Sequence, residues 1–146
     1  MHHTKDKGDI GTLKIMCDLA MQGYKILTPH SEHLPFDIAI FNPEDGKIYK
    51  VQCKHRKVSS KGVVNIQLRT TYLSSAGNVS KRYNGGDFDV IAVYCPDIDK
   101  CAYITESKCS HLNHCMTLRI NPPKEGVCKK RSVEIHNFMD YLKLEL

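Results

Sequence analysis

No stretch of the sequence approaches the run of about 18 apolar residues that a membrane-spanning helix requires, and no signal-peptide apolar segment follows the polar start. The even cysteine count typical of a disulfide framework is also missing, since the chain has seven cysteines. Several of them lie in apolar runs, where a free thiol behaves as a small buried hydrophobe. The sequence therefore disfavours membrane proteins and secreted disulfide-rich domains. It predicts a cytoplasmic protein with reduced thiols.

Linkers and internal repeats are absent as well, so residues 1–146 are expected to form one domain with enough material for a core. Hydrophobic residues make up 41% of the chain and charged residues 25%, which is close to an average soluble protein. The formal charge of +5 permits a polyanionic partner but does not require one. Any functional conclusion must therefore come from local motifs.

Apolar periodicity predicts an α/β fold in which a mixed central β-sheet is flanked by helices. A helix is expected over 9–21, with Gly23 as its stop. The residues that carry its three- and four-residue spacing are Ile10, Leu13, Cys17 and Ala20. A final helix is expected to begin after Ser132 as N-cap. Its apolar side would be formed by Ile135, Phe138 and Leu142.

Short apolar or alternating runs bounded by turn residues predict the strands. Their expected ranges are 24–27, 36–41, 47–54, 63–68, 89–94, 101–104 and 116–120. The Asn-Pro-Glu-Asp-Gly turn at 42–46 makes the second and third of these antiparallel neighbours. Residues 73–86 are rich in Ser, Gly and Asn, so a loop is expected there.

Asp37, Gln52 and Lys54 form the most informative pattern in the sequence. Side chains two residues apart on a strand share a face, so Gln52 and Lys54 point the same way. Asp37 lies on the partner strand and meets both of them if the turn sets the register. A carboxylate, an amide oxygen and an ammonium would then come together.

Such a trio suits a metal-bound phosphate, because Mg²⁺ usually takes one or two carboxylates together with waters and substrate phosphate. Asp37 would be the charged ligand, and Gln52 would give its side-chain carbonyl. The main-chain carbonyl of Cys53 would add another oxygen. Lys54 would hold the scissile phosphate, or orient and help deprotonate a metal-bound water. The predicted chemistry is metal-assisted hydrolysis of a phosphodiester.

The run Pro35-Phe36-Asp37, followed by Gln52-Cys53-Lys54, resembles the motif of the PD-(D/E)XK nuclease superfamily. That motif places an acid after a proline, then Asp or Glu, any residue, and Lys. Here Phe36 separates the proline from the acid, and Gln52 replaces the second acid. Both variations are similar to a branch that includes homing endonucleases encoded in cyanobacterial group I introns. The likeness runs through 3–11, 31–37 and 87–94 and is less secure after 105.

The resemblance implies a restriction-endonuclease-like nuclease core. The expected activity is that of a sequence-specific, Mg²⁺-dependent double-strand DNA endonuclease of the intron-homing type, with Mn²⁺ able to substitute. A homo-oligomer, either a dimer or a tetramer, is also expected, because a small chain cannot easily span a long asymmetric site alone. Related nucleases carry an acid on the first helix, for which Asp9 is the candidate catalytic and metal-binding residue. Thr12 stands where that branch often has Glu. Asp9 equally suits a helix N-terminus through the dipole.

Basic residues follow the trio and surround a segment at about 56–86, which would be a DNA-contacting insertion of strand and loop. The predicted DNA-binding residues are His55, Arg56, Lys57, Lys61, Asn65, Gln67, Arg69, Lys81 and Arg82. The cations would contact phosphates, whereas Asn65, Gln67 and Arg69, alternating along one strand, would face a groove and read base edges. The alternative for each residue alone is a solvated polar face.

Other readings stay open. Asp87 and Asp89 bracket Phe88 at a strand start and are alternative metal ligands, but they lack an adjacent Lys and are interpreted mainly as strand-edge or hydrogen-bonding acids. A possible zinc site is formed by Cys109, His111, His114 and Cys115, with Cys128 downstream, although the spacing matches no common zinc finger. In function, the alternatives are a junction resolvase or restriction enzyme of the same superfamily, or a non-catalytic DNA-binding module in which Gln52 marks a decayed site.

Overall fold

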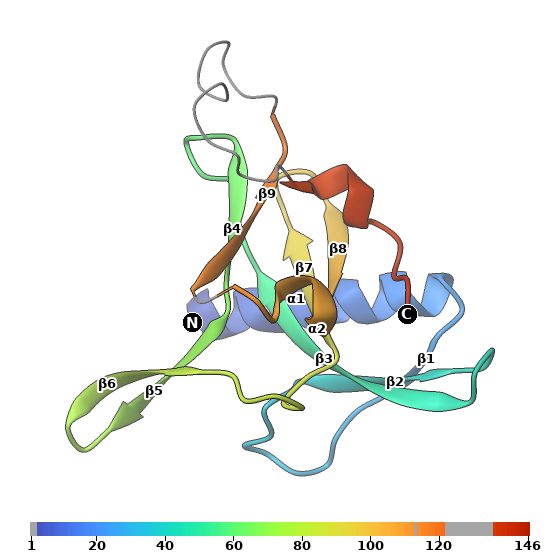
Figure 1. The fold of residues 1–146 in the computed structure, drawn as a ribbon, viewed down its shortest axis with the longest axis horizontal. Coiled ribbons are helices and arrows are strands. Elements are labelled where there is room, and N and C mark those ends of the chain that lie inside the picture. Colours follow the sequence, from blue (N-terminus) through green and yellow to red (C-terminus); the bar gives the residue numbers. More distant parts are fainter. Residues whose placement is uncertain (1–2, 113, 122–135) are drawn as a thin grey trace.

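The computed structural model describes residues 3–112, 114–121 and 136–146, with the main chain alone at 71–73. One long helix, a five-stranded sheet and a second layer of strands and short helices pack on one another (Figure 1). The five-stranded sheet separates two apolar clusters, one beneath the long helix and one beneath the second layer. The predicted α/β class, a mixed sheet flanked by helices, is confirmed.

The long helix α1 (His3–Met21) includes the predicted range and begins six residues earlier than expected. Gly23 follows it with a φ of 100°, a left-handed conformation that glycine adopts without strain and that ends a helix. The buried side is formed by Gly11, Ile15 and Leu19. A Cβ at Gly11 would come within 3.1 Å of the Cβ of His55, so glycine allows the helix to lie close to the sheet.

The residues used to predict α1 lie on its outer side. Ile10 and Leu13 are 51% and 63% exposed, and Cys17 and Ala20 are exposed as well. A second set of residues at four-residue spacing faces the sheet instead. The periodicity therefore predicted the helix correctly but the wrong buried side, because apolar residues occur on both sides of it.

The five-stranded sheet has the order β1-β2-β3-β7-β8. Its strands are β1 (Lys25–Leu27), β2 (Ile38–Asn42), β3 (Lys47–His55), β7 (Val90–Cys95) and β8 (Lys100–Thr105). The β3–β7 pair is parallel and the other pairs are antiparallel. At the β2–β3 turn the Asn42 side chain accepts a hydrogen bond from the Glu44 amide, and Gly46 has a φ of 71°. The predicted strands and their antiparallel hairpin are confirmed.

The second layer contains β4 (Val63–Gln67), β9 (Cys115–Arg119), β10 (His136–Asn137), α2 (Glu106–Cys109) and the 3₁₀ helix η1 (Phe138–Tyr141). The order of its sheet is β10-β9-β4. β4 and β9 confirm the strands expected near 63–68 and 116–120. The final helix was wrong where it can be examined, because 136–137 pair with β9 and only one short 3₁₀ turn follows. Ser132 and Ile135 lie outside the described residues. Phe138 is fully buried, so tertiary packing decides the conformation here.

The loop expected at 73–86 was also wrong for most of its length. β5 (Arg69–Ser74) and β6 (Gly77–Arg82) form a separate two-stranded hairpin that projects from the body (Figure 1). The Ser74 hydroxyl donates to the carbonyl of Gly77 and accepts from the amide of Ala76, which closes the turn. The described side chains of β6 are polar on both faces except Val79, so the alternating pattern of a half-buried strand is missing.

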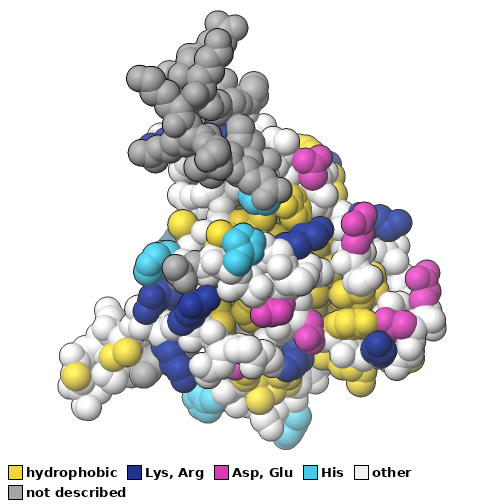
Figure 2. All heavy atoms as spheres, viewed as in Figure 1, with side chains coloured by type: hydrophobic (Ala, Val, Ile, Leu, Met, Phe, Trp, Pro, Cys, Tyr) yellow, Lys and Arg dark blue, Asp and Glu magenta, His cyan; other side chains and the backbone are white. Residues whose placement is uncertain are grey.

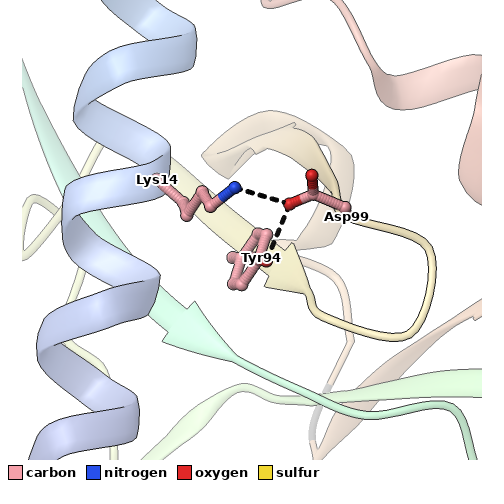
Figure 3. Close-up of polar contacts among 3 residues, drawn as sticks. All are labelled: Lys14, Tyr94 and Asp99. Carbon is pink, nitrogen blue, oxygen red and sulfur yellow. Dashed lines mark hydrogen bonds and ion pairs between the residues drawn. The ribbon is translucent and has the colours of Figure 1, made fainter.

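Lys14, Tyr94 and Asp99 join α1 to the β7–β8 turn (Figure 3). The Lys14 ammonium lies 2.8 Å from Asp99 Oδ1, and the Tyr94 hydroxyl donates to the same oxygen at 2.8 Å. Asp99 has a φ of 48°, a left-handed conformation that Asp tolerates better than most residues. Both partners lower the pKa of the Asp99 carboxyl, the Lys14 hydrogen bond most strongly. The cluster fixes the helix against the end of the sheet.

The cysteines that the structure describes are all free thiols. They are Cys17, Cys53, Cys95, Cys101, Cys109 and Cys115, and Cys128 lies outside the described residues. Within the described part of the chain, no helix is long and apolar enough to cross a membrane.

Candidate active site

The β2–β3 hairpin brings Asp37, Gln52 and Lys54 together. Ile38 pairs with Val51, so Asp37, immediately before β2, stands opposite Gln52. The Asp37 amide also donates to the Val51 carbonyl at 3.0 Å, which extends the ladder by one step. Val51 belongs to the cluster beneath α1, and alternation places Gln52 and Lys54 on the opposite face of β3. The register predicted from the turn is therefore present.

The Asp37 carboxylate is oriented by two donors. Its Oδ2 accepts from Gln52 Nε2 at 2.6 Å and from the Cys53 amide at 2.7 Å. The residue keeps an exposed edge, yet protein atoms crowd the carboxyl group, and this burial raises its pKa. The Cys53 N–H and the Lys54 ammonium act in the opposite direction. Among the described residues no hydrogen bond reaches Oδ1, so one hard oxygen is available for a cation.

Lys54 is half-buried between charged and aromatic groups. Its ammonium donates to the Tyr83 hydroxyl at 3.3 Å and lies 5.5 Å from the centre of that ring. Burial lowers the pKa of Lys54 to about 8; the nearby Arg56 contributes to the decrease and Asp37 opposes it. At neutral pH the group is therefore a cation that loses its proton more easily than a solvated lysine.

The side chain of Cys53 points to the other face of β3, toward α1. Burial raises the pKa of this thiol strongly, and a hydrogen bond with Thr12 only partly offsets the effect. Thr12 therefore lies against the α1-covered face, and its hydroxyl also donates to the Gly8 carbonyl at 3.1 Å. Only the main chain of Cys53 is on the side of Asp37.

Asp9 is exposed on the first part of α1, one turn before Thr12. In the portion of the chain that the structure describes, no hydrogen bond or ion pair joins Asp9 to Asp37, Gln52 or Lys54. Its role at the metal site stays a prediction.

The predicted DNA-binding residues fall into separate groups. Lys57, Lys61, Lys81 and Arg82 are exposed, and so are Asn65 and Gln67 on β4. Basic side chains gather where the β5–β6 hairpin meets the body (Figure 2). His55, in contrast, packs beneath Gly11 and against the edge of the Tyr94 ring, on the α1 side of the sheet.

The sequence suggested that Asn65, Gln67 and Arg69 alternate along one strand. The structure shows that they do not. β4 ends at Gln67, the Leu68 amide donates to the His114 carbonyl, and Arg69 opens β5. Arg69 donates to the hydroxyl and the carbonyl of Ser80 across the hairpin. The change of sheet after Gln67 therefore separates Arg69 from the other two.

Tyr83 is the site residue whose position the sequence did not reveal. It follows β6 and lies 29 residues from Lys54 in the chain, and a chain-reversing hairpin separates the two. An isolated tyrosine among basic residues is a weak signal for a lysine partner. The neighbouring Arg56, predicted to bind DNA, also acts on Lys54 through its charge.

The alternative metal candidates are placed differently. Asp87 accepts from the Asn84 amide and Asp89 from the Lys50 amide, which is the hydrogen-bonding role expected of them. The Cys109 thiol is buried and points back to the carbonyls of Thr105 and Glu106. Over the described residues, no three His, Cys, Asp or Glu side chains are grouped as a metal site.

The donor set of the hairpin fits a hard divalent cation. It offers one carboxylate oxygen and neutral oxygens from an amide or the main chain, a donor set that Mg²⁺ completes with waters and phosphate. Lys54 adds a cation beside Asp37 for an anionic substrate. Chemically, the arrangement can orient a phosphodiester and a water on one face of β3.

Comparisons with known proteins bear on the family and the fold. No curated protein matched the chain in a sequence search. Among solved structures, a bacterial homing endonuclease, I-Ssp6803I, has the same fold, with a TM-score of 0.66 and 23% identity. The match covers 94% of this chain and 87% of that one. The family model described as PD-(D/E)XK endonuclease matches residues 2–141. The chain therefore belongs to the PD-(D/E)XK endonuclease family.

Proposed function

We propose that the protein is a sequence-specific, Mg²⁺-dependent double-strand DNA endonuclease of the intron-homing type. The observation that carries the proposal is the contact of Asp37 with Gln52 and Cys53 on the face of β3 that also bears Lys54. The family match over 2–141 supports phosphodiester hydrolysis, and the fold shared with a homing endonuclease supports the homing assignment.

The metal ion, Mg²⁺ or in its place Mn²⁺, would supply a Lewis acid and an acidified water. Asp37 would hold it through Oδ1. Gln52 would hold it through its amide oxygen, because the hydrogen bond to Asp37 uses only the amide nitrogen. The N–H and C=O of one strand residue point to the same edge, so the Cys53 carbonyl lies on the Asp37 side, like its amide. Asp9 remains a further candidate.

Lys54 would bind the scissile phosphate through its ammonium. Its low pKa also permits it to receive a proton from the attacking water at a slightly alkaline pH. The Asp37 oxygen that its two N–H donors leave unoccupied is the one that would hold the metal ion, so the carboxylate would act on that water through the ion. The exposed cations around the β5–β6 hairpin would hold the DNA backbone, while Asn65 and Gln67 would face base edges.

A homo-oligomer forms part of the proposal, because one chain carries a single Asp37 site and a duplex has two strands to cut. A dimer supplies two sites, and a tetramer supplies four.

The deciding experiment incubates purified protein with genomic and plasmid DNA, with Mg²⁺ or EDTA, and maps the break ends. We expect cleavage at a few fixed sites that requires the metal. Asp37→Ala and Lys54→Ala should each lower the cleavage rate by about 10³-fold with DNA binding largely intact. Full cleavage by either variant would refute the site assignment.

The same experiment separates the alternatives. Cuts at many sites would indicate a restriction enzyme, and preference for a four-way junction over linear duplex would indicate a resolvase. Binding without any cleavage, with or without metal, would indicate a DNA-binding module with a decayed site.

A further inference from the structure

Tyr83 touches the candidate active site without belonging to the motif. Its hydroxyl accepts the hydrogen bond from Lys54 Nζ at 3.3 Å, and its ring lies below the same ammonium at 5.5 Å. In the described chain, no other hydrogen bond of the Lys54 ammonium is present. The hydroxyl therefore makes the directional contact that fixes this flexible side chain.

Tyr83 is itself held in place. Its ring meets Phe88 edge to face, with centroids 5.2 Å apart, and Phe88 is buried in the cluster beneath the second layer. The turn between them is closed by Asp87, whose carboxylate accepts from the Asn84 amide at 2.7 Å. Lys50 of β3 reaches the Gly86 carbonyl of the same turn. The tyrosine is thus anchored to the body, not to the projecting hairpin alone.

A lysine side chain has four rotatable bonds and loses rotamer entropy when it is fixed. On the face of β3 the other charged groups acting on Lys54 are Arg56, which repels it, and Asp37, which attracts it. Without Tyr83, these two would draw the ammonium toward Asp37, where it would compete with a metal ion. The Tyr83 contact provides a second anchor for the ammonium, besides the attraction of the carboxylate.

We propose that Tyr83 is a positioning residue, whose hydroxyl holds the Lys54 ammonium beside Asp37 in a fixed place where it can meet the phosphate. This inference rests on the proposed function. Tyr83 need not touch the DNA; it acts through Lys54.

The test uses Tyr83→Phe, which removes only the hydroxyl and keeps the ring against Phe88. With DNA saturating and Mg²⁺ present, we expect the single-turnover cleavage rate to fall about 10- to 100-fold, while the DNA concentration for half-maximal rate changes less than twofold. An unchanged rate would overturn the proposal. A weaker half-maximal concentration with an unchanged maximal rate would also overturn it, since Tyr83 would then be a DNA contact.

A second measurement needs no activity. In metal-free protein with labelled lysine, the Lys54 ε-methylene protons should give two separate resonances while the side chain is fixed. In Tyr83→Phe they should collapse toward the averaged position of exposed lysines. Unchanged Lys54 resonances would overturn the inference. If the wild type cuts no DNA, the proposed function fails, but these spectra still decide whether Tyr83 holds Lys54.

Tyr49→Phe is the matched control. Tyr49 lies on the same strand as Lys54, and its hydroxyl donates to Asp45 at 2.6 Å near the β2–β3 turn. The substitution likewise removes one hydroxyl hydrogen bond to a charged side chain, without touching Lys54. We expect wild-type cleavage and wild-type Lys54 resonances, and a loss equal to that of Tyr83→Phe would contradict a specific role for Tyr83.

Discussion

At the scale of single residues, Gln52 would set the charge of the proposed metal site. Its amide nitrogen lies 2.6 Å from Asp37 Oδ2, a contact that a carboxylate could not make without strong repulsion in the metal-free protein. By this hydrogen bond the glutamine holds Asp37 in the metal-free protein, and it would leave a bound ion with one protein carboxylate from the hairpin. A site with this donor set should bind divalent metal weakly until substrate phosphate completes the shell.

Gln52→Glu tests whether the glutamine favours the stability of the metal-free site at the expense of metal affinity. The second carboxylate should tighten Mn²⁺ binding by about tenfold, the equivalent of one pKa unit of interaction, and lower the melting temperature of the metal-free protein. Isothermal titration and thermal unfolding in EDTA measure both effects. Gln52→Ala serves as the companion variant, and should weaken metal binding and free the Asp37 side chain. Identical metal affinity in all three proteins would remove Gln52 from the metal shell.

Lys54 links the site to pH. Its pKa of about 8 in the folded chain lies below the value of 10.5 for an unperturbed lysine, so the unfolded chain binds more protons between these values. The Lys54 contribution to the free energy of unfolding therefore rises as pH increases through that window. Buried cysteines and tyrosines with raised pKa act in the opposite direction, so the measurement must be a difference.

The comparison is between wild type and Lys54→Met, by urea unfolding in EDTA from pH 7 to 10. The wild type should gain stability relative to the variant above about pH 8. The variant keeps most of the side-chain volume, so packing changes contribute equally at every pH. A constant difference across the range would show that Lys54 has the pKa of a solvated lysine.

At the scale of elements, what the sequence could predict depended on burial. The strands of the central sheet carry continuous or alternating apolar residues, and β2, β3, β7 and β8 were predicted within a few residues. The trio was predictable for the same reason, because one short turn fixes its register. The β5–β6 hairpin was missed because the mostly polar residues of β6 give no period. β10 forms only by pairing with β9, and the position of Tyr83 depends on a contact with Lys54, 29 residues away in the chain. Neither feature leaves a local pattern in the sequence.

Strands β4 and β6 are proposed to contact a duplex in different ways, and two substitutions distinguish them. Lys81→Ala on β6 should weaken binding to every DNA sequence alike and reduce the salt dependence of log K by about one unit of slope. Gln67→Ala on β4 should leave that slope unchanged and relax sequence preference by about 1–3 kcal/mol at one base pair. Both residues are exposed, so stability should change little.

The measurement is a set of binding isotherms over a range of salt concentrations, on DNA that contains a site the wild type cuts and on random DNA of equal length. Asp37→Ala protein keeps the DNA intact throughout. If Gln67→Ala lowers affinity for both DNAs equally, β4 is a backbone contact, and its assignment to base readout is wrong.

At the scale of the whole molecule, the two faces of the central sheet have different tasks. One carries Asp37, Gln52 and Lys54. The other is covered by α1, whose outer side exposes an apolar stripe formed by Ile10, Leu13, Cys17, Ala20 and Met21. Leu13 is 63% and Met21 81% exposed. Contiguous exposed apolar surface of this kind marks interaction sites in soluble proteins. An assembly through the stripe would leave every active site open on the opposite side.

Leu13→Glu tests whether copies of the chain associate through this stripe. Wild type should sediment as a dimer or tetramer. The variant should dissociate at least about tenfold more readily, because association would bury a carboxylate without a partner. The circular dichroism and melting temperature of the variant should match those of wild-type protein diluted until it is monomeric, since position 13 faces away from the core.

The control is Ile48→Glu, which alters another exposed apolar side chain, on β3, and should keep the wild-type mass. A monomeric wild type, or an unchanged mass in Leu13→Glu, would exclude the stripe as the interface, and the second active site that a double-strand cut requires would have to come through a different surface.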